Sequence, residues 1–158
     1  MTGPAGASSS QGIKAAGSNR IPFALIAILS LAGIIISAIS LERHYAKSAT
    51  EFCDFSQQFS CDIVNRSEYS SIMGIPVAGI GVAGYAALLL LATLWKSRRE
   101  TPLRLLAAAM AGLAFALYLT YIEAYVLETW CILCVISLVL ISLIAVLTLI
   151  VKLRSTNV

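Results

Sequence analysis

The chain has 158 residues, of which 59% are hydrophobic and 12% are charged, and its formal net charge is +3. Soluble domains contain about 45–50% apolar and about 25% charged residues, so the composition excludes an ordinary water-soluble globule and a disordered chain. The 11 basic residues form no stripe of the kind that binds nucleic acid. The length indicates one domain, and the apolar excess indicates that this domain lies in a membrane.

Four long apolar runs predict membrane-spanning helices. A span needs about 20 mostly apolar residues, because the hydrocarbon core is about 30 Å thick. None of the runs alternates between apolar and polar residues, so helices are favoured over a β-barrel. We therefore predict an all-α membrane protein, a bundle of four transmembrane helices with an outward loop or short helix between the first two. The predicted spans are residues 22–41, 75–95, 103–126 and 131–151.

The segments outside the spans are predicted to be short tails and one long loop. Residues 1–19 are rich in Gly, Ala and Ser, which predicts a disordered cytoplasmic tail. A cleaved signal peptide is disfavoured, because the apolar run 22–41 is longer than a signal core of about 7–15 residues. The membrane domain is predicted over residues 20–152, and residues 153–158 are predicted to be a second cytoplasmic tail.

Basic residues are divided unevenly between the two ends of the predicted bundle. Eight of the 11 lie with the two termini and the connection between the second and third spans, and three lie in the loop 43–74. Cytoplasmic segments carry the excess of Lys and Arg, so both termini are predicted in the cytoplasm and the loop outside. We expect a bacterial inner membrane with this loop facing the periplasm or exterior, or the membrane of the endoplasmic reticulum in a eukaryote.

The four cysteines form two pairs on the predicted outer side. Cys53 and Cys61 lie in the loop with seven residues between them, and Cys131 and Cys134 form a Cys-x-x-Cys motif at the start of the last span. Disulfides persist in oxidising compartments, and a helix N-terminus favours the thiolate that attacks disulfides. The arrangement favours an electron relay, in which the loop pair meets an external partner and the membrane pair meets a lipid-soluble carrier.

Two other interpretations of the cysteines remain open. Both pairs could be structural disulfides in a non-enzymatic four-span protein, although a disulfide across Cys-x-x-Cys closes a small loop and adds little stability. A four-thiolate zinc site is disfavoured, because two spans separate the pairs and no other cluster of ligands supports it. We therefore predict no metal site.

The ordered set of motifs resembles the vitamin K epoxide reductase family over residues 20–150. The matching features are the two cysteine pairs in this order, Ser67 six residues after Cys61, and Gly74-Ile75-Pro76 at the start of the second span. The resemblance implies a four-helix bundle around a quinone, of the ubiquinone or the menaquinone (vitamin K) type. It also implies a bacterial-type homologue, and because this sequence stops at Val158 we expect no fused thioredoxin-like domain.

The resemblance further implies a role for each cysteine. Cys131 and Cys134 match the redox centre, with Cys134 nearest the quinone, and Cys53 and Cys61 match the shuttle pair. Cys53 would face a separate thioredoxin-fold, DsbA-like partner, and Cys61 would exchange with Cys131. The implied activity is a thiol–quinone oxidoreduction that supports disulfide bond formation.

The resemblance also implies contacts with the quinone, and the sequence departs from the family pattern at two of these positions. Val77, four residues before Gly81, stands where the family has an asparagine, and Leu138 stands where the animal enzymes have a tyrosine. Both departures remove polar contacts, so vitamin K epoxide reduction of the animal type is the less favoured alternative. Tyr118 is added because it belongs to a run of tyrosines at helical spacing. The expected contacts are Ser67, Cys134, Val77, Gly81, Tyr118 and Leu138.

Two ionisable residues near the outer membrane surface are given ordinary explanations. His44 lies just outside the first span, where an interfacial polar residue is common. Glu123 lies about one turn from the outer end of the third span, so we expect its carboxylate to reach the membrane surface.

Overall fold

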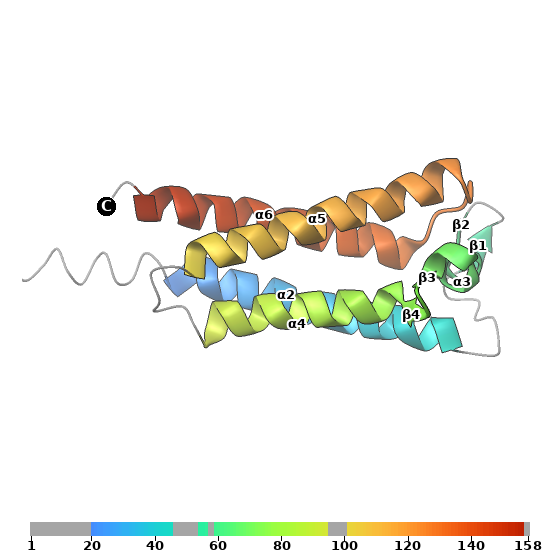
Figure 1. Ribbon diagram of the computed structural model, residues 1–158, viewed down its shortest axis with the longest axis horizontal. Coiled ribbons are helices and arrows are strands. Elements are labelled where there is room, and N and C mark those ends of the chain that lie inside the picture. The colour runs from blue at the N-terminus through green and yellow to red at the C-terminus, as the bar shows by residue number, and fades with distance from the viewer. Residues whose placement is uncertain (1–19, 46–53, 57–58, 95–100, 157–158) are drawn as a thin grey trace, which may run out of the picture.

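The computed structural model describes residues 20–45, 54–56, 59–94 and 101–156 (Figure 1). Within these ranges, four long helices run side by side and form a bundle, as predicted. The α5–α6 connection and the segment between α2 and α4 lie at one end, and the described chain ends of α2 and α6 lie at the other (Figure 1). The helices are α2 (Arg20–Tyr45), α4 (Val77–Thr93), α5 (Thr101–Tyr125) and α6 (Ile132–Thr156).

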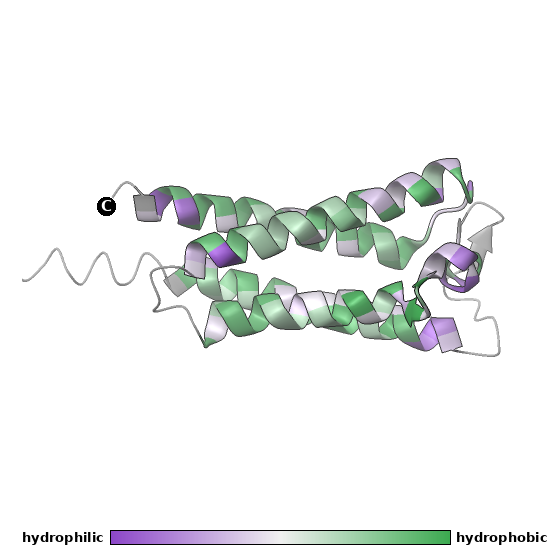
Figure 2. Cartoon of the chain, in the orientation of Figure 1, coloured by the Kyte–Doolittle hydropathy of each residue, from purple (hydrophilic) through white to green (hydrophobic). Residues whose placement is uncertain are grey.

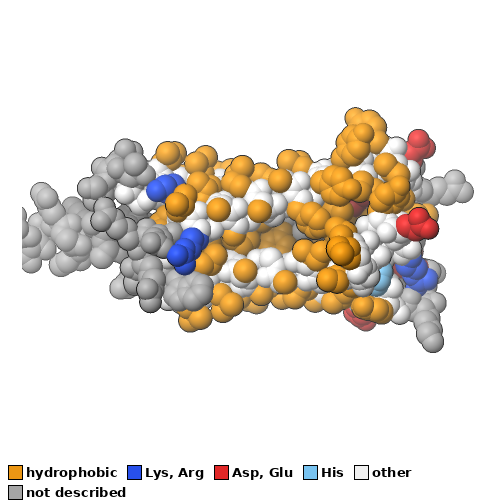
Figure 3. All heavy atoms as spheres, in the orientation of Figure 1, with side chains coloured by type: hydrophobic (Ala, Val, Ile, Leu, Met, Phe, Trp, Pro, Cys, Tyr) orange, Lys and Arg blue, Asp and Glu red, His pale blue; other side chains and the backbone are white. Residues whose placement is uncertain are grey.

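The outer surface of the bundle is that of a membrane protein. Helices α2, α5 and α6 are long and apolar enough to cross a membrane, and α4 is a shorter apolar helix. Hydrophobic residues cover the helices along their length, whereas hydrophilic residues gather at the ends (Figure 2). On the face shown in Figure 3, the Lys, Arg, Asp and Glu side chains lie at the two ends of the bundle. The protein is therefore a multi-pass integral membrane protein.

The segment between α2 and α4 folds into short elements over one end of the bundle. Helix α3 (Cys61–Arg66) begins where the Ser60 hydroxyl accepts a hydrogen bond from Ile63 N at 3.3 Å, which caps its first turn. The remaining elements are β1 (Asp54–Ser56), β2 (Phe59–Ser60), η1 (Glu68–Ser70), β3 (Ser71–Ile72) and β4 (Ile75–Pro76), with β1 paired to β2 and β3 paired to β4, both antiparallel.

A two-residue turn joins β3 to β4 and leads the chain into α4. Its residues, Met73 and Gly74, have φ angles of 53° and 83°. Tight hairpins favour positive φ at both central positions, because this matches the twist of the strands, and glycine adopts it without steric cost. The turn positions Pro76 directly before the first residue of α4.

Small residues allow the helices to approach one another closely. The Tyr85 ring of α4 lies against the backbone of Gly33 in α2, and a Cβ at Gly81 would stand 2.9 Å from the Ser37 hydroxyl. A Cβ at Gly112 of α5 would stand 3.1 Å from Ile141 of α6. Close backbone approach at small residues is the usual way that helices associate within a membrane.

The helix bounds differ from the predicted spans at several ends. Helix α2 continues to Tyr45 and α6 to Thr156, past the predicted ends at residues 41 and 151. Helices extend beyond the apolar run because the long stems of Lys and Arg reach from apolar surface to water. Helix α4 instead begins later than the predicted span, at Val77, because Ile75 and Pro76 form strand β4. The predicted tail 1–19 lies outside the described residues.

Candidate active site

Three cysteines come together at the end of the bundle covered by α3. Cys61 is the first residue of α3, Cys131 directly precedes α6, and Cys134 lies in the first turn of α6. The side chains of Cys61 and Cys131 are 1% and 0% exposed. The Cys131 thiol forms hydrogen-bond contacts with both Cys134 and Cys61. The structure thus brings together three of the four predicted cysteines, and the fourth, Cys53, lies outside the described residues.

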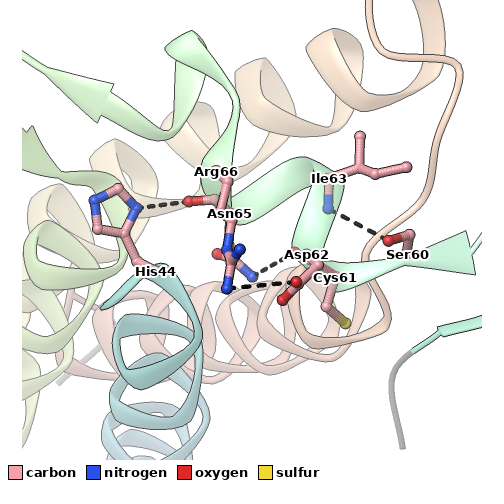
Figure 4. A network of polar contacts seen from close by, with 7 residues as sticks. All are labelled: His44, Ser60, Cys61, Asp62, Ile63, Asn65 and Arg66. Carbon is pink, nitrogen blue, oxygen red and sulfur yellow. Dashed lines mark hydrogen bonds and ion pairs between the residues drawn. The ribbon is translucent and has the colours of Figure 1, made fainter. Parts of the chain in front are cut away.

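The Asn65 side chain connects this cysteine group to helix α2. Its Oδ1 accepts a hydrogen bond from the Ser40 hydroxyl at 2.7 Å. Its Nδ2 donates to the Cys61 carbonyl oxygen at 3.0 Å and faces the Cys131 Sγ at 4.0 Å (Figure 4 shows the Cys61 contact). Asn65 is buried, so these contacts supply the partners that a buried amide needs. The sequence analysis did not identify this residue.

His44 belongs to the same polar group. Its Nδ1 lies 2.6 Å from the Asn65 carbonyl oxygen and 3.4 Å from the Ser70 hydroxyl (Figure 4 shows the first contact). A carbonyl oxygen only accepts hydrogen bonds, so this contact assigns the proton to Nδ1 and leaves Nε2 without one in the neutral ring. His44 is therefore not a simple interfacial residue, because it lines the cavity described below.

Glu123 is buried beside the Cys-x-x-Cys motif. Its side chain is 2% exposed, and its Oε2 accepts a hydrogen bond from the Cys131 backbone N–H at 3.2 Å. Its Oε1 has no hydrogen bond of standard geometry among the described residues, although the carboxylate interacts with the Cys134 thiol. The expectation that Glu123 reaches the membrane surface is wrong. The chain turns back after α5, with Thr129 N donating to the Glu123 carbonyl oxygen at 3.2 Å, and this connection lies beside the carboxylate.

A cavity of about 390 Å³ lies between the helices and reaches the cysteine group. Its polar wall includes His44, Asn65, Ser67, Glu123 and Cys134. Most of the remaining wall is apolar, and α4 and α5 contribute small residues to it. The volume and this mixture of a largely apolar wall with a few polar groups are typical of a site for a small molecule. The small lining residues of these two helices are Ala78, Gly81, Gly84, Ala87, Ala108, Ala111, Gly112 and Ala116.

Four of the six expected contact positions line this cavity: Ser67, Val77, Gly81 and Cys134. The Ser67 hydroxyl also donates to the Val64 carbonyl oxygen at 2.9 Å, so it caps the end of α3 as well. Its proton is therefore engaged, while its oxygen can still accept a hydrogen bond.

Tyr118 and Leu138 are placed elsewhere. Tyr118 is 55% exposed, and neither residue lines the cavity. Helical spacing correctly indicated that the tyrosines of α5 share a face, but this face points away from the bundle, as the exposure of Tyr121 and Tyr125 also shows. The aromatic residues that line the cavity include Tyr69, Tyr85 and Phe115. The Tyr85 hydroxyl lies 2.9 Å from both the carbonyl oxygen and the hydroxyl of Ser137.

The chemistry open to this site is thiol chemistry beside a small-molecule cavity. Among the described residues, no group of three His, Cys, Asp or Glu side chains is arranged to hold a metal ion. Cys131 and Cys134 are both thiols, and Cys134 borders the cavity. As a disulfide, this pair can exchange with the Cys61 thiol on one side, and as two thiols it can reduce a bound molecule on the other.

Comparison with known protein families matches residues 24–149 to the Vitamin K epoxide reductase family. The matched segment begins near the start of α2 and ends near the end of α6. It therefore contains every element that forms the cavity and both cysteine pairs.

Proposed function

The chain belongs to the vitamin K epoxide reductase family, and from this premise we propose that it oxidises a thioredoxin-fold partner and passes the electrons to quinone, so that disulfide bonds form in other proteins. Members of the family are quinone-reducing thiol oxidoreductases, and the protein is a quinone-dependent thiol/disulfide oxidoreductase. The observation that carries the proposal is the contact of Cys131 with Cys61 and Cys134, together with the position of Cys134 at the cavity.

The proposed relay consists of two thiol–disulfide exchanges and one quinone reduction. The partner's two thiols reduce the Cys53–Cys61 disulfide, and the partner leaves with a disulfide. The Cys61 thiolate then attacks Cys131 of the Cys131–Cys134 disulfide, which releases Cys134 as a thiolate. Attack by Cys53 on the mixed disulfide restores the Cys53–Cys61 bond, and the reduced pair of α6 gives two electrons and two protons to quinone. The contact between Cys61 and Cys131 supports the second step.

The cavity supports a quinone of the ubiquinone or menaquinone type. Small residues of α4 and α5 leave room for a flat ring, and the surface of the bundle is hollowed between these two helices (Figure 3). Val77 lines the cavity with an apolar side chain, and Leu138 does not reach it. These two positions supply no polar contact for an epoxide oxygen, which favours simple quinone reduction by a bacterial-type enzyme over vitamin K epoxide reduction.

The proposed orientation places the cysteine end outside the cytoplasm. Among the described residues, Arg104, Lys152 and Arg154 lie toward the opposite end of the bundle, with the described chain ends. The cysteine end carries Arg43 and Arg66, but acidic residues outnumber them there, among them Asp62, Glu68 and Glu128. Lys and Arg remain cytoplasmic, so this distribution supports cytoplasmic termini and thiol chemistry in an oxidising compartment. We propose a bacterial inner membrane, or the endoplasmic reticulum in a eukaryote.

Quinone reduction by single cysteine variants tests the proposal. The purified protein in detergent is given a short-chain ubiquinone or menadione, with either dithiothreitol or a reduced thioredoxin-fold protein as the donor. We expect Cys131→Ala and Cys134→Ala to lose turnover with both donors, because they remove the pair that meets the quinone. We expect Cys53→Ala and Cys61→Ala to lose turnover only with the protein donor.

Each alternative gives a different result in this assay. Turnover retained by Cys134→Ala would contradict the assignment of the quinone-reducing thiol. Turnover with the protein donor retained by Cys61→Ala would remove the loop pair from the relay. Reduction of vitamin K epoxide at a rate similar to that of the quinones would favour the animal-type activity.

A further inference from the structure

We propose that Glu123 is a catalytic residue, an internal acid–base group that takes the proton of the Cys134 thiol and delivers it to the bound quinone. This inference depends on the proposed function, because it concerns the step in which the thiol pair reduces quinone. It assigns to Glu123 a role for which the family match provides no evidence.

The environment of Glu123 is the first reason. Glu123 is 2% exposed, and burial of a carboxylate costs free energy unless its oxygens are paired. Its Oε2 is paired with the Cys131 N–H at 3.2 Å, but its Oε1 has no hydrogen bond of standard geometry among the described residues. The unpaired oxygen belongs to a residue that lines the cavity and interacts with Cys134. Buried unpaired polar atoms in a site point to a ligand or a catalytic role.

Several other polar groups of the cavity wall have hydrogen-bonding partners of their own. The His44 Nδ1 proton is held by the Asn65 carbonyl oxygen, and the Ser67 hydroxyl proton by the Val64 carbonyl oxygen. The Asn65 amide carries no titratable proton and bonds to Ser40 and Cys61. Among the described residues that line the cavity, Glu123 is the one carboxylate. Glu123 also interacts directly with the Cys134 thiol, so it is the group best placed to accept a proton from the Cys134 sulfur.

The proposed step conserves protons and electrons. Glu123, as a carboxylate, accepts the Cys134 proton, and the resulting thiolate gives an electron pair to the quinone. The Cys131 sulfur bonds to the Cys134 sulfur, which completes the disulfide and accounts for both electrons. Glu123 returns its proton to one quinone oxygen, and the proton released by Cys131 goes to the other. Two thiols and one quinone thus become one disulfide and one quinol, and Glu123 ends as a carboxylate.

The test compares Glu123→Gln with Glu128→Gln in the full-length protein, using dithiothreitol and a short-chain ubiquinone. Glutamine keeps an oxygen that can accept the Cys131 N–H, but it cannot take a proton. Glu128 is exposed in the connection between α5 and α6, so the same substitution there is the matched control. The titratable groups that face Glu123 are Cys131 and Cys134, with Cys61 beyond them, and all three are unchanged in both variants.

We expect Glu123→Gln to lower turnover at neutral pH by about 100-fold, the lower end of what an acid–base group contributes. Its rate should rise with pH, about tenfold per unit in the alkaline range, because hydroxide must then deprotonate the thiol. Glu123→Asp should recover part of the rate at neutral pH, and Glu128→Gln should match the wild type.

Two results would overturn the inference while leaving the proposed function intact. The first is a Glu123→Gln variant with the wild-type rate. The second is a variant whose rate is lowered by the same factor at every pH, which would assign Glu123 a structural role only. Absence of turnover in the wild type would instead refute the proposed function, and this inference would fall with it.

Discussion

A single side-chain amide, that of Asn65, connects the elements that carry the cysteines. It bonds to Ser40 of α2, to the Cys61 carbonyl oxygen of α3, and faces Cys131 before α6. In the proposed exchange, the Cys61 sulfur must approach Cys131 in line with the Cys131–Cys134 bond. The positions of Cys61 and Cys131 both depend on contacts with the Asn65 amide. We therefore expect Asn65 to act as a positioning residue for the proposed exchange.

Asn65→Leu should lower both the unfolding free energy and the turnover with a protein donor. Leucine has a similar size but leaves the Ser40 hydroxyl and the Cys61 carbonyl oxygen without their partner, so we expect a loss of about 1–3 kcal/mol in unfolding free energy. Turnover with a thioredoxin-fold donor should fall more than turnover with dithiothreitol, which can reduce the α6 pair directly. Thermal midpoints and the two donor assays check this. Equal losses with both donors would show that Asn65 supports only the fold.

Glu123 and His44 show what the sequence leaves undetermined at the scale of single residues. Position near a span end led us to expect both at the membrane surface, but Glu123 is buried and His44 lines the cavity, because their partners lie on other elements. His44 bonds to a carbonyl 21 residues further along the chain, and Glu123 is covered by the connection that follows α5. Hydropathy along the sequence predicts where a membrane span begins and ends. The burial of a residue near that end depends on which other element packs over it.

At the scale of elements, the contact of α2 with α4 depends on the absence of a side chain at Gly33. The Tyr85 ring occupies the space where a Cβ would lie. This ring has little freedom to move, because its hydroxyl is held at 2.9 Å by Ser137 of α6. One glycine therefore fixes the distance between α2 and α4, and one tyrosine links this pair to α6.

Gly33→Ala should destabilise the bundle, and Gly84→Ala provides the comparison. The added methyl at position 33 must displace the Tyr85 ring, so we expect a cost of about 1–3 kcal/mol. A Cβ at Gly84 meets nothing within 4 Å, so the same change there should alter stability by about 0.5 kcal/mol or less. Unfolding midpoints in detergent measure both. Equal midpoints for the two variants would contradict the close α2–α4 contact.

The helices were predictable from the sequence, and the short elements between them were predictable only in part. A run of about 20 apolar residues is long enough to cross the membrane, so four spans can be predicted without knowledge of how the helices pack. The loop was expected to hold a short helix, and α3 confirms this, but strands β1 to β4 contain only two or three residues each. Such strands have too few positions for a period of two to be recognised. The face occupied by Tyr118 was also undetermined, because spacing groups residues without choosing a direction.

At the scale of the whole molecule, charge is segregated to the two ends, and this predicts how the protein lies in the membrane. Met73, in the turn before α4, is 98% exposed at the cysteine end, and Ser155 is exposed at the opposite end of α6. We expect a membrane-impermeant maleimide to label Met73→Cys in intact cells and Ser155→Cys only after permeabilisation. Mass spectrometry of the labelled peptides identifies the site. Labelling of Ser155→Cys in intact cells would contradict cytoplasmic termini.

The overall assembly could be predicted from the sequence to the level of a four-helix bundle with cysteines at one end. The order of the two cysteine pairs and the matching motifs indicated which thiols meet, and the structure brings Cys61, Cys131 and Cys134 together. The cavity wall was less accessible to prediction, because it is made from residues of α2, α4, α5 and α6 at once. Tyr85 and Asn65 have no local signature of this position, and only the packing of the helices reveals it.

The gathering of all the reactive groups at one end has an energetic consequence. Moving one elementary charge across the membrane costs or releases about 2.3 kcal/mol per 100 mV. Cys61, Cys131, Cys134 and Glu123 all lie at the same end, so in the proposed reaction electrons and protons pass from thiol to quinone without crossing the electric field of the bilayer. In such an arrangement the reaction neither draws on the membrane potential nor adds to it. The proposed reaction would therefore have the same driving force whether the membrane is fully energised or depolarised.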